Sequence, residues 1–250
     1  MTESPNLDDA IALDPVDLAD VGPDMRRDMA AAGAAVRRAG AELAESGSNV
    51  VAEMLRGAAE FFEWDHYSVG DIYDWESHSQ YYYHAHPAEN RRRYFADEHG
   101  HFHTFLRAKG MPAGMVPAPV ADFRPLDDEN DMLTHFVAIA MDSTGEAIGL
   151  FTTNRWVTGE TWYAAEDVIS MLDRFGVAHE RPASAANRWI TGMLALFRPD
   201  IEMLLRRRDA VVAARAEALP AHNVYEDRGL EVTAYMDISV AQRIAGLGET

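Results

Sequence analysis

The chain contains no cysteine among its 250 residues. This absence excludes a disulfide framework, a thiolate metal site and a cysteine nucleophile. Long apolar runs are also missing, since none approaches the roughly 18 residues that a membrane span needs. The opening stretch MTESPNLDDAIALDPVDLADVGPD is acidic and lacks the basic and apolar segments of a secretion signal. We therefore expect a cytoplasmic protein without a membrane partner.

Basic charge is scarce. Lysine and arginine number 22 against 41 acidic residues, which gives a formal net charge of −19. Such a field repels phosphate backbones, so we expect no nucleic-acid partner. The two short basic runs, Arg91–Arg93 and Arg206–Arg208, are interpreted as solvated or ion-paired surface.

Several motifs of known enzymes are absent as well. The sequence has no glycine-rich dinucleotide loop, no phosphate loop, no Gly-x-Ser-x-Gly elbow and no His-Glu-x-x-His helix. Any chemistry must therefore be argued from other residues.

The N-terminal quarter is predicted to be an acidic arm followed by helices. Residues 1–22 are predicted to form a loosely held, flexible arm, and a helix is expected to begin at Pro23. The triplet Ser46-Gly47-Ser48 ends that helix, and a second helix follows over residues 49–63. Residues 23–62 thus form an N-terminal helical segment ahead of a domain over residues 63–250.

The amino-acid composition changes at Trp64, after which aromatic and β-branched residues dominate. Strands are predicted in SQYYYHAH and HGHFHTFL, and a hairpin in MLTHFVAIAMD-STGE-AIGLFTTNRWVTG. The Pro- and Gly-rich residues 109–131 predict a long loop, and helices return after Gly159 with a restart near Pro199. With a last strand in RGLEVTAYMDIS, the prediction is an α+β fold. One mostly antiparallel sheet carries a histidine-rich face and is flanked by N-terminal and C-terminal helices.

Five of the ten histidines fall between Tyr81 and Phe105, at a spacing of two. Side chains two apart in a strand share a face, so His84 pairs with His86, and His99 groups with His101 and His103. If His84 lies opposite His101, then His86 lies opposite His99 and Tyr82 opposite His103.

This pattern predicts a divalent metal site. Two histidines and a carboxylate suit non-haem iron, and three histidines with water suit zinc. Glu89 and Glu98 are the candidate carboxylates, and Glu98 is also a candidate to orient a ligand. The candidate ligands are His84, His86, His99, His101, His103 and His135. Two other interpretations stay open, a polar network that lines a ligand pocket and an exposed, pH-responsive face.

Other residues are candidates for supporting roles. Arg155, expected on a strand, can clamp an anionic group of a substrate or else pair with an acidic residue. Tyr82 shares the parity of the histidines and can offer its phenol to the pocket. Asp74 either caps a turn or orients a metal-bound histidine.

The motifs YDWESHSQYYYHAHP, EHGHFHTFLR, LFTTNRWVTGETWY and NRWITGMLALFRPDIE resemble a family of uncharacterised bacterial proteins known only as a domain of unknown function. The resemblance spans about residues 60 to 240. It implies that this region is one unit containing the histidine strands, and it implies no activity.

The leading hypothesis is a metal-dependent enzyme, an oxygenase or a hydrolase, that acts on a small and anionic molecule with iron or zinc. The loop over residues 109–131 would then be a lid. The alternatives are a non-catalytic cofactor or ligand carrier or sensor, and an interaction protein with a polar histidine surface. Association into homo-oligomers through the N-terminal helices is compatible with each of these hypotheses.

Overall fold

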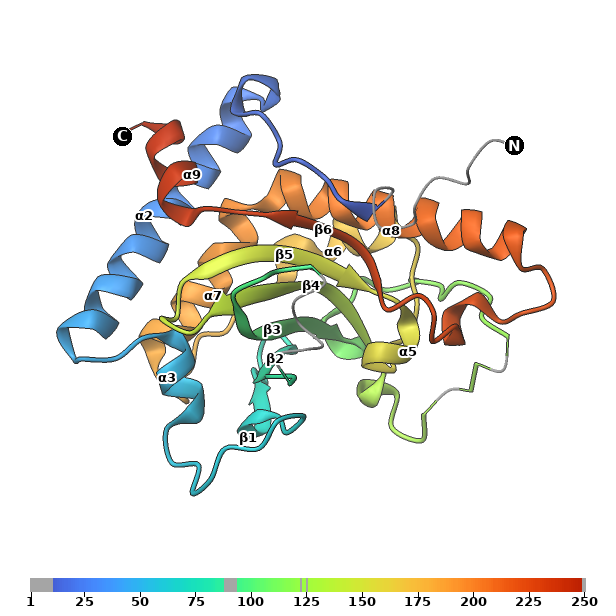
Figure 1. Cartoon of the computed structure of the whole chain (residues 1–250), viewed down its shortest axis with the longest axis horizontal. Helices are drawn as coiled ribbons and strands as arrows, with labels where there is room; N and C mark the ends of the chain where they lie inside the picture. Colours follow the sequence, from blue (N-terminus) through green and yellow to red (C-terminus); the bar gives the residue numbers. More distant parts are fainter. Residues whose placement is uncertain (1–10, 88–93, 122, 125, 249–250) are drawn as a thin grey trace.

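The structure is a computed structural model that describes residues 11–87, 94–121, 123–124 and 126–248. Its centre is a six-stranded antiparallel sheet in which the strands follow one another in sequence order (Figure 1). This confirms the predicted α+β fold. The strands are β1 (Tyr67–Tyr73), β2 (Ser79–His84), β3 (Glu98–Arg107), β4 (Leu133–Asp142), β5 (Ala147–Thr153) and β6 (Val232–Asp237).

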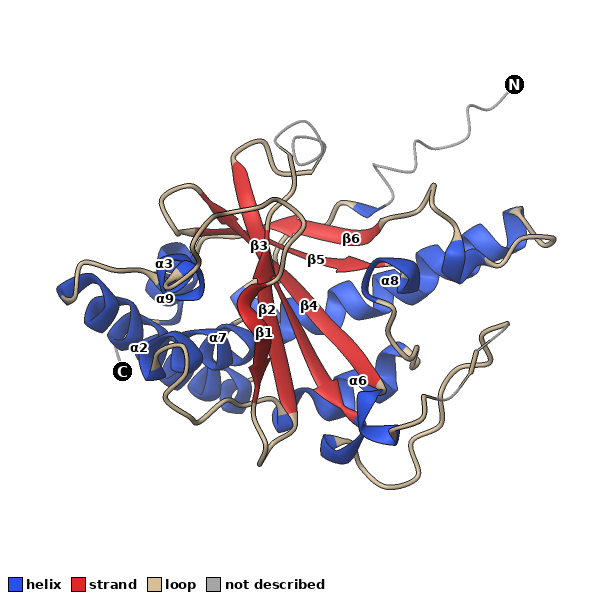
Figure 2. Ribbon diagram, turned by 90° about the horizontal axis from the view of Figure 1, so that it is seen from below, coloured by secondary structure: helices blue, strands red, loops and turns tan. Residues whose placement is uncertain are grey.

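Helices precede and follow the first five strands. The α-helices are α2 (Pro23–Glu45), α3 (Val50–Leu55), α5 (Arg155–Thr158), α6 (Ala165–Met171), α7 (Ser184–Leu196), α8 (Arg198–Ala218) and α9 (Val240–Leu247). Short 3-10 turns are η1 (Leu18–Asp20), η2 (Ala108–Gly110), η3 (Glu129–Asp131), η4 (Leu172–Arg174) and η5 (Val224–Glu226). Helix α2 lies beside α7 and α9 (Figure 2).

The predicted start of α2 is confirmed, because Pro23 occupies its first turn. The second helix is shorter than expected. It begins after the cap Asn49, whose side chain accepts from the backbone N–H of Ala52 at 2.8 Å, and it ends at Leu55. Gly57 then adopts a φ of 84°, a left-handed conformation that cannot continue a helix.

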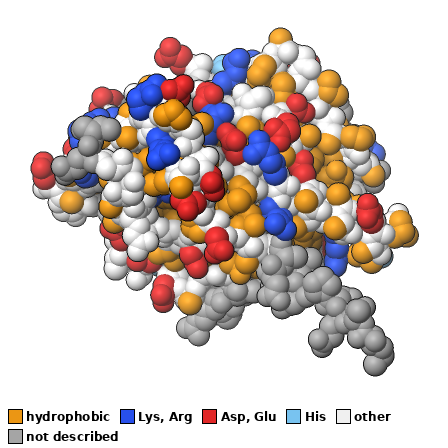
Figure 3. All heavy atoms as spheres, turned by 90° about the horizontal axis from the view of Figure 1, so that it is seen from above, with side chains coloured by type: hydrophobic (Ala, Val, Ile, Leu, Met, Phe, Trp, Pro, Cys, Tyr) orange, Lys and Arg blue, Asp and Glu red, His pale blue; other side chains and the backbone are white. Residues whose placement is uncertain are grey.

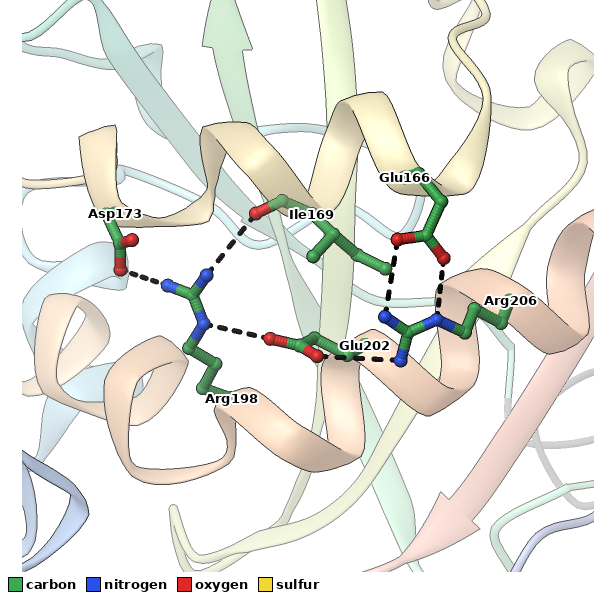
Figure 4. A network of polar contacts seen from close by, with 6 residues as sticks. All are labelled: Glu166, Ile169, Asp173, Arg198, Glu202 and Arg206. Atoms are coloured by element: carbon green, nitrogen blue, oxygen red, sulfur yellow. Dashed lines mark hydrogen bonds and ion pairs between the residues drawn. The ribbon is translucent and has the colours of Figure 1, made fainter. Parts of the chain in front are cut away.

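The predicted restart near Pro199 is also confirmed, since α7 ends at Leu196 and α8 begins at Arg198. Figure 4 shows ion pairs that join α8 to α6 and η4. Arg206 Nε lies 2.7 Å from Glu166 Oε1 of α6, and Arg198 pairs with Asp173 of η4. Within α8, Arg198 Nε lies 3.0 Å from Glu202 Oε1. Arg206 thus has the ion-paired role predicted for its basic run, whereas Arg208 of the same run is buried. The other run, Arg91–Arg93, lies outside the described residues.

The sheet has an apolar cluster on each face, because successive side chains of a strand point to opposite sides. Tyr81 and Tyr83 belong to the larger cluster, which includes residues of α2, α3, α6 and α7. The smaller cluster includes Ala138, Ala140 and Phe151 together with residues from α8 and the loops. The histidines of β2 and β3 lie on this second face, where helices cover less of the sheet.

The two ends of the described chain meet. Leu13 donates its backbone N–H to the carbonyl of Tyr235 on β6, and Val16 donates to Asp200 Oδ1 at 2.9 Å. Arg243 of α9 reaches the same carboxylate at 2.7 Å, and both side chains of this ion pair are buried. Residues 11–22, which fall in the expected arm, therefore pack against the body of the protein.

The outer surface carries mixed charge. On the face shown in Figure 3, basic and acidic side chains are interspersed, so the negative net charge is not gathered there into one patch. Within the described ranges, no helix combines the length and the apolarity needed to cross a lipid bilayer.

Candidate metal centre

The predicted register of β2 and β3 is confirmed. His84 lies opposite His101, and Tyr82 lies opposite His103. The ring centroids of His84 and His101 are 4.6 Å apart, and those of Tyr82 and His103 are 5.3 Å apart. The spacing of two in both segments therefore gathers imidazoles on one face of the sheet.

Three histidines form a group that can hold a metal ion. His84, His86 and His101 each offer one nitrogen, and these nitrogens all lie within 4.8 Å of one another. Nε2 of His84 lies 2.7 Å from Nε2 of His86, which directly follows β2. The group is buried, with His101 deepest, while His84 and His86 keep some exposed surface.

A carboxylate orients the deepest ring. Glu98 Oε1 lies 2.5 Å from Nδ1 of His101, and both side chains are 6 % exposed. A carboxylate at Nδ1 holds the proton there and leaves Nε2 with a lone pair, as in many metal-bound histidines. The contact thus matches the orienting role predicted for Glu98.

A second pair of histidines continues the polar strip. Nδ1 of His103 lies 3.0 Å from Nε2 of His135, and both residues are buried. His135 reaches this face because β4 contains a bulge. Two β3 residues, His103 and Phe105, pair with Ala138 and His135, which are three apart.

The pair combines a neutral ring with a nitrogen that lacks a partner. Burial, followed by the charges of Arg208 and His101, lowers the pKa of His135 to about 3, so its ring is neutral. Nε2 of His103 is buried and has no hydrogen-bond partner within the described chain.

Burial favours the neutral form of two of these histidines. It lowers the pKa of His84 far below its ordinary value, and the neighbouring His101, His86 and His66 lower it further. The pKa of His103 is also lowered, chiefly by burial. The neutral imidazole is the form that binds metal, so neither His84 nor His103 has to lose a proton at neutral pH.

A buried glutamate lies beside these histidines, and it was not among the site residues predicted from the sequence. Glu160 is 1 % exposed and accepts the backbone N–H of His135 at 2.8 Å. Burial raises its pKa to about 7, although the nearby Arg208 opposes the shift. The sequence offered only a glutamate between Gly159 and Thr161, which is no signal of burial.

The structure separates His99 from the other histidines, which corrects its predicted face. A bulge between Glu98 and Gly100 inserts one residue, so Glu98 and His101 share a face and His99 turns to the other. There Nδ1 of His99 lies 2.7 Å from the hydroxyl of Tyr83. The pairing of β2 with β3 ends at His84, so His86 does not lie opposite His99.

Of the two roles predicted for Asp74, the structure shows turn capping. Asp74 caps the β1–β2 turn, accepting the backbone N–H groups of Glu76 and Ser77 at 2.9 Å, and it also accepts from Ala178. Glu89, the second candidate carboxylate, lies outside the described residues.

Arg155 does not lie on a strand, which is a further correction. Strand β5 ends at Thr153, and the side chain of Asn154 caps the short helix α5 that begins with Arg155. The guanidinium pairs with Glu226, as in the alternative weighed for it. Its Nε is buried and lacks a hydrogen-bond partner among the residues that the structure describes.

Tyr82 lies among the histidines, and two residues that precede β1 join it there. The ring of His66 stacks on Tyr82 with centroids 3.7 Å apart, and the ring of Trp64 lies 4.3 Å from that of His86. His66 lies in the loop before β1, and its side chain is 46 % exposed. Strand β1 was not predicted, so nothing connected these residues with the histidines.

Comparison with known proteins gives one match. A family model described as a domain of unknown function (DUF6969) matches residues 30–238. The match covers more than half of the chain and includes all the histidines of the cluster. No curated protein and no solved structure matches the chain.

Proposed function

The chain belongs to the DUF6969 family, and we propose that it is a metal-dependent enzyme whose divalent ion is held by His84, His86 and His101. One observation carries this proposal. Three imidazole nitrogens within 4.8 Å of one another are buried on one sheet face, and a carboxylate orients one of the rings. Imidazole nitrogens gathered this closely can act together as ligands of one divalent ion.

The donor set favours zinc or iron. Imidazole nitrogen is a common ligand for Zn²⁺ and Fe²⁺, and three protein ligands leave coordination positions open for water or substrate. The sequence has no cysteine, so no thiolate competes for a softer ion. His103, whose ring centroid lies 4.8 Å from that of His101, is the nearest candidate for an additional nitrogen ligand.

An open position gives such a site its chemistry. Bound Zn²⁺ lowers the pKa of a water ligand to about 7 and creates a nucleophile, whereas Fe²⁺ supports reactions with dioxygen. We propose a small organic molecule as substrate, because the cluster lies on one sheet face beside Trp64 and His66, whose rings keep exposed surface. The metal that the protein selects decides between a hydrolase and an oxygenase.

Elemental analysis of the chain purified without a histidine tag tests the proposal. We expect close to one zinc or iron per chain, and its loss in a folded His84→Ala/His86→Ala variant. The matched control is His222→Ala, which removes an exposed histidine after α8 and should leave the metal content unchanged. A wild-type chain that takes up neither metal after reconstitution would contradict the proposal.

The enzyme claim needs a further measurement. The chain loaded with Co²⁺ reports its coordination through visible absorption, and azide binds only where a position is open. A spectral change on azide addition is expected. An unchanged spectrum would indicate a closed site, and the protein would then be a metal carrier or a structural metal protein.

A further inference from the structure

The segment just before β1 lies across the histidine cluster. Tyr67 pairs with Tyr83, and continuing this antiparallel register by one residue places His66 opposite His84, with ring centroids 5.7 Å apart. The N–H of Trp64 donates to the carbonyl of Ala85 at 2.9 Å, which is one residue out of that register. The ring of Trp64 nevertheless lies against that of His86, with centroids 4.3 Å apart.

The backbone of Trp64 adopts an unfavourable conformation. Its φ is 74°, a left-handed conformation that is unfavourable for a tryptophan. The turn is held on its other side by Tyr67, whose hydroxyl accepts the backbone N–H of Phe62 at 2.7 Å. Strained residues of this kind are concentrated at functional sites. The indole lies against the ring of His86 and is nevertheless 55 % exposed.

His66 is held by three neighbours. Asp71 Oδ1 lies 3.2 Å from its Nδ1, and Gln80 donates to the other oxygen of Asp71 at 2.6 Å. Tyr82 stacks on the ring at an interplanar angle of 9°. The side chain of His66 is still 46 % exposed. A ring that is oriented and yet open to solvent is placed to contact a ligand.

Resting on the metal site proposed above, we infer that Trp64 and His66 form the substrate-contacting wall of that site. The substrate would carry a planar aromatic or conjugated group next to the oxygen atoms that bind the metal. Both rings touch the metal-binding histidines on one side and solvent on the other. Flat rings stack best on flat partners, and indole also offers a large apolar face.

The exposed side chains just before β1 support this inference. Phe62 and Trp64 are large apolar side chains that are 54 % and 55 % exposed. Exposed apolar side chains that lie close together mark binding surfaces.

The test uses two small chelators on the Co²⁺-loaded chain. Acetohydroxamate and benzohydroxamate bind a metal through the same two oxygens and differ only in a methyl or a phenyl group. We expect the wild-type chain to bind benzohydroxamate at least fivefold more tightly than acetohydroxamate. Visible absorption of the bound Co²⁺ measures both affinities. The variant Trp64→Gly should lose most of this preference, and glycine suits the local φ.

Trp75→Ala is the matched control, because it removes a tryptophan that is 80 % exposed at the other end of β1. It should keep the full preference for the phenyl group. An unchanged preference in Trp64→Gly would overturn the inference. Trp64→Asn, which also tolerates a positive φ, serves as the second variant if the glycine variant does not fold.

His66→Ala tests the other half of the wall. It should keep one Co²⁺ per chain and weaken benzohydroxamate binding several-fold. Loss of Co²⁺ in this variant would make His66 a ligand and overturn its place in the wall. Failure of the wild-type chain to bind Co²⁺ is seen before any chelator is added, and it would count against the metal site itself.

Discussion

His84 and His101 lie directly opposite one another on β2 and β3, with their ring centroids 4.6 Å apart. Because side chains alternate along a strand, a slip of one residue would place them on opposite faces of the sheet. The candidate metal centre therefore depends on this register, and we expect variants that disturb it to affect stability and metal binding together.

The first prediction concerns the carboxylate that orients His101. Glu98→Gln replaces the acceptor at Nδ1 with a neutral amide, which weakens the hydrogen bond and the basicity of the ring. We expect the affinity for Zn²⁺ to fall about 10- to 100-fold, as for other partners of metal-bound histidines. Competition with a coloured chelator measures the change. Glu76→Gln, an exposed glutamate in the β1–β2 turn, should have no effect.

The second prediction concerns the stability of the metal-free chain at acidic pH. His135 has a pKa of about 3 in the folded chain and an ordinary value of 6.5 when unfolded. Below pH 6.5 the unfolded state binds a proton that the folded state does not, so acid destabilises the fold. One such histidine costs roughly 1 kcal/mol between pH 7 and pH 5.5. The lowered pKa values of His84 and His103 act in the same direction.

Urea unfolding of the chelator-treated chain at the two pH values measures this loss. His135→Gln keeps a donor and an acceptor in place and removes the titration. Its loss of stability on acidification should be smaller than that of the wild-type chain by about 1 kcal/mol. Equal losses in the two chains would show that His135 does not titrate as described.

Glu160 acts with the opposite sign, which gives the third prediction. Its pKa of about 7 lies above the ordinary 4.5, so the folded state holds a proton that the unfolded state has released. This stabilises the fold below pH 4.5 and is lost as the pH rises through 7. Glu160→Gln removes this stabilisation, which in the wild-type chain opposes the destabilising effect of the histidines on acidification. The variant should therefore lose roughly 1–2 kcal/mol more than the wild-type chain between pH 7 and pH 5.5.

The fourth prediction concerns Gly100, where β2 and β3 approach closely. A Cβ at this position would lie 2.5 Å from the carbonyl oxygen of His84 and 2.5 Å from the hydroxyl of Tyr83. Gly100→Ala should cost about 1–3 kcal/mol and weaken metal binding, because the strands must separate beside His84. Gly176→Ala is the control, since the nearest atom would be 4.0 Å away. Thermal unfolding and Zn²⁺ titration compare the two variants.

Much of the sheet follows from local patterns in the sequence. The period of two in SQYYYH and HFHTF was enough to predict the pairing of His84 with His101 and of Tyr82 with His103. Helix α2 and the restart before Pro199 follow from the conformational limits of proline.

The remaining features depend on contacts that no local pattern contains. The bulge after Glu98 turns His99 away, and the bulge in β4 brings His135 in, although both segments look regular in the sequence. Arg155 lies in a helical turn and not in the predicted strand, because the side chain of Asn154 caps that turn. Trp64 and His66 reach the cluster through β1, whose Gly70 and Asp71 have positive φ angles and weaken its strand signal.

X-ray absorption at the metal edge tests the central claim most directly. The chain reconstituted with one equivalent of Zn²⁺ should show three imidazole nitrogens at about 2.0–2.1 Å and a further light ligand. The His101→Ala variant should lose one of these imidazoles. A spectrum with no imidazole scattering, or one that His101→Ala leaves unchanged, would contradict the assignment of His84, His86 and His101 as a metal site.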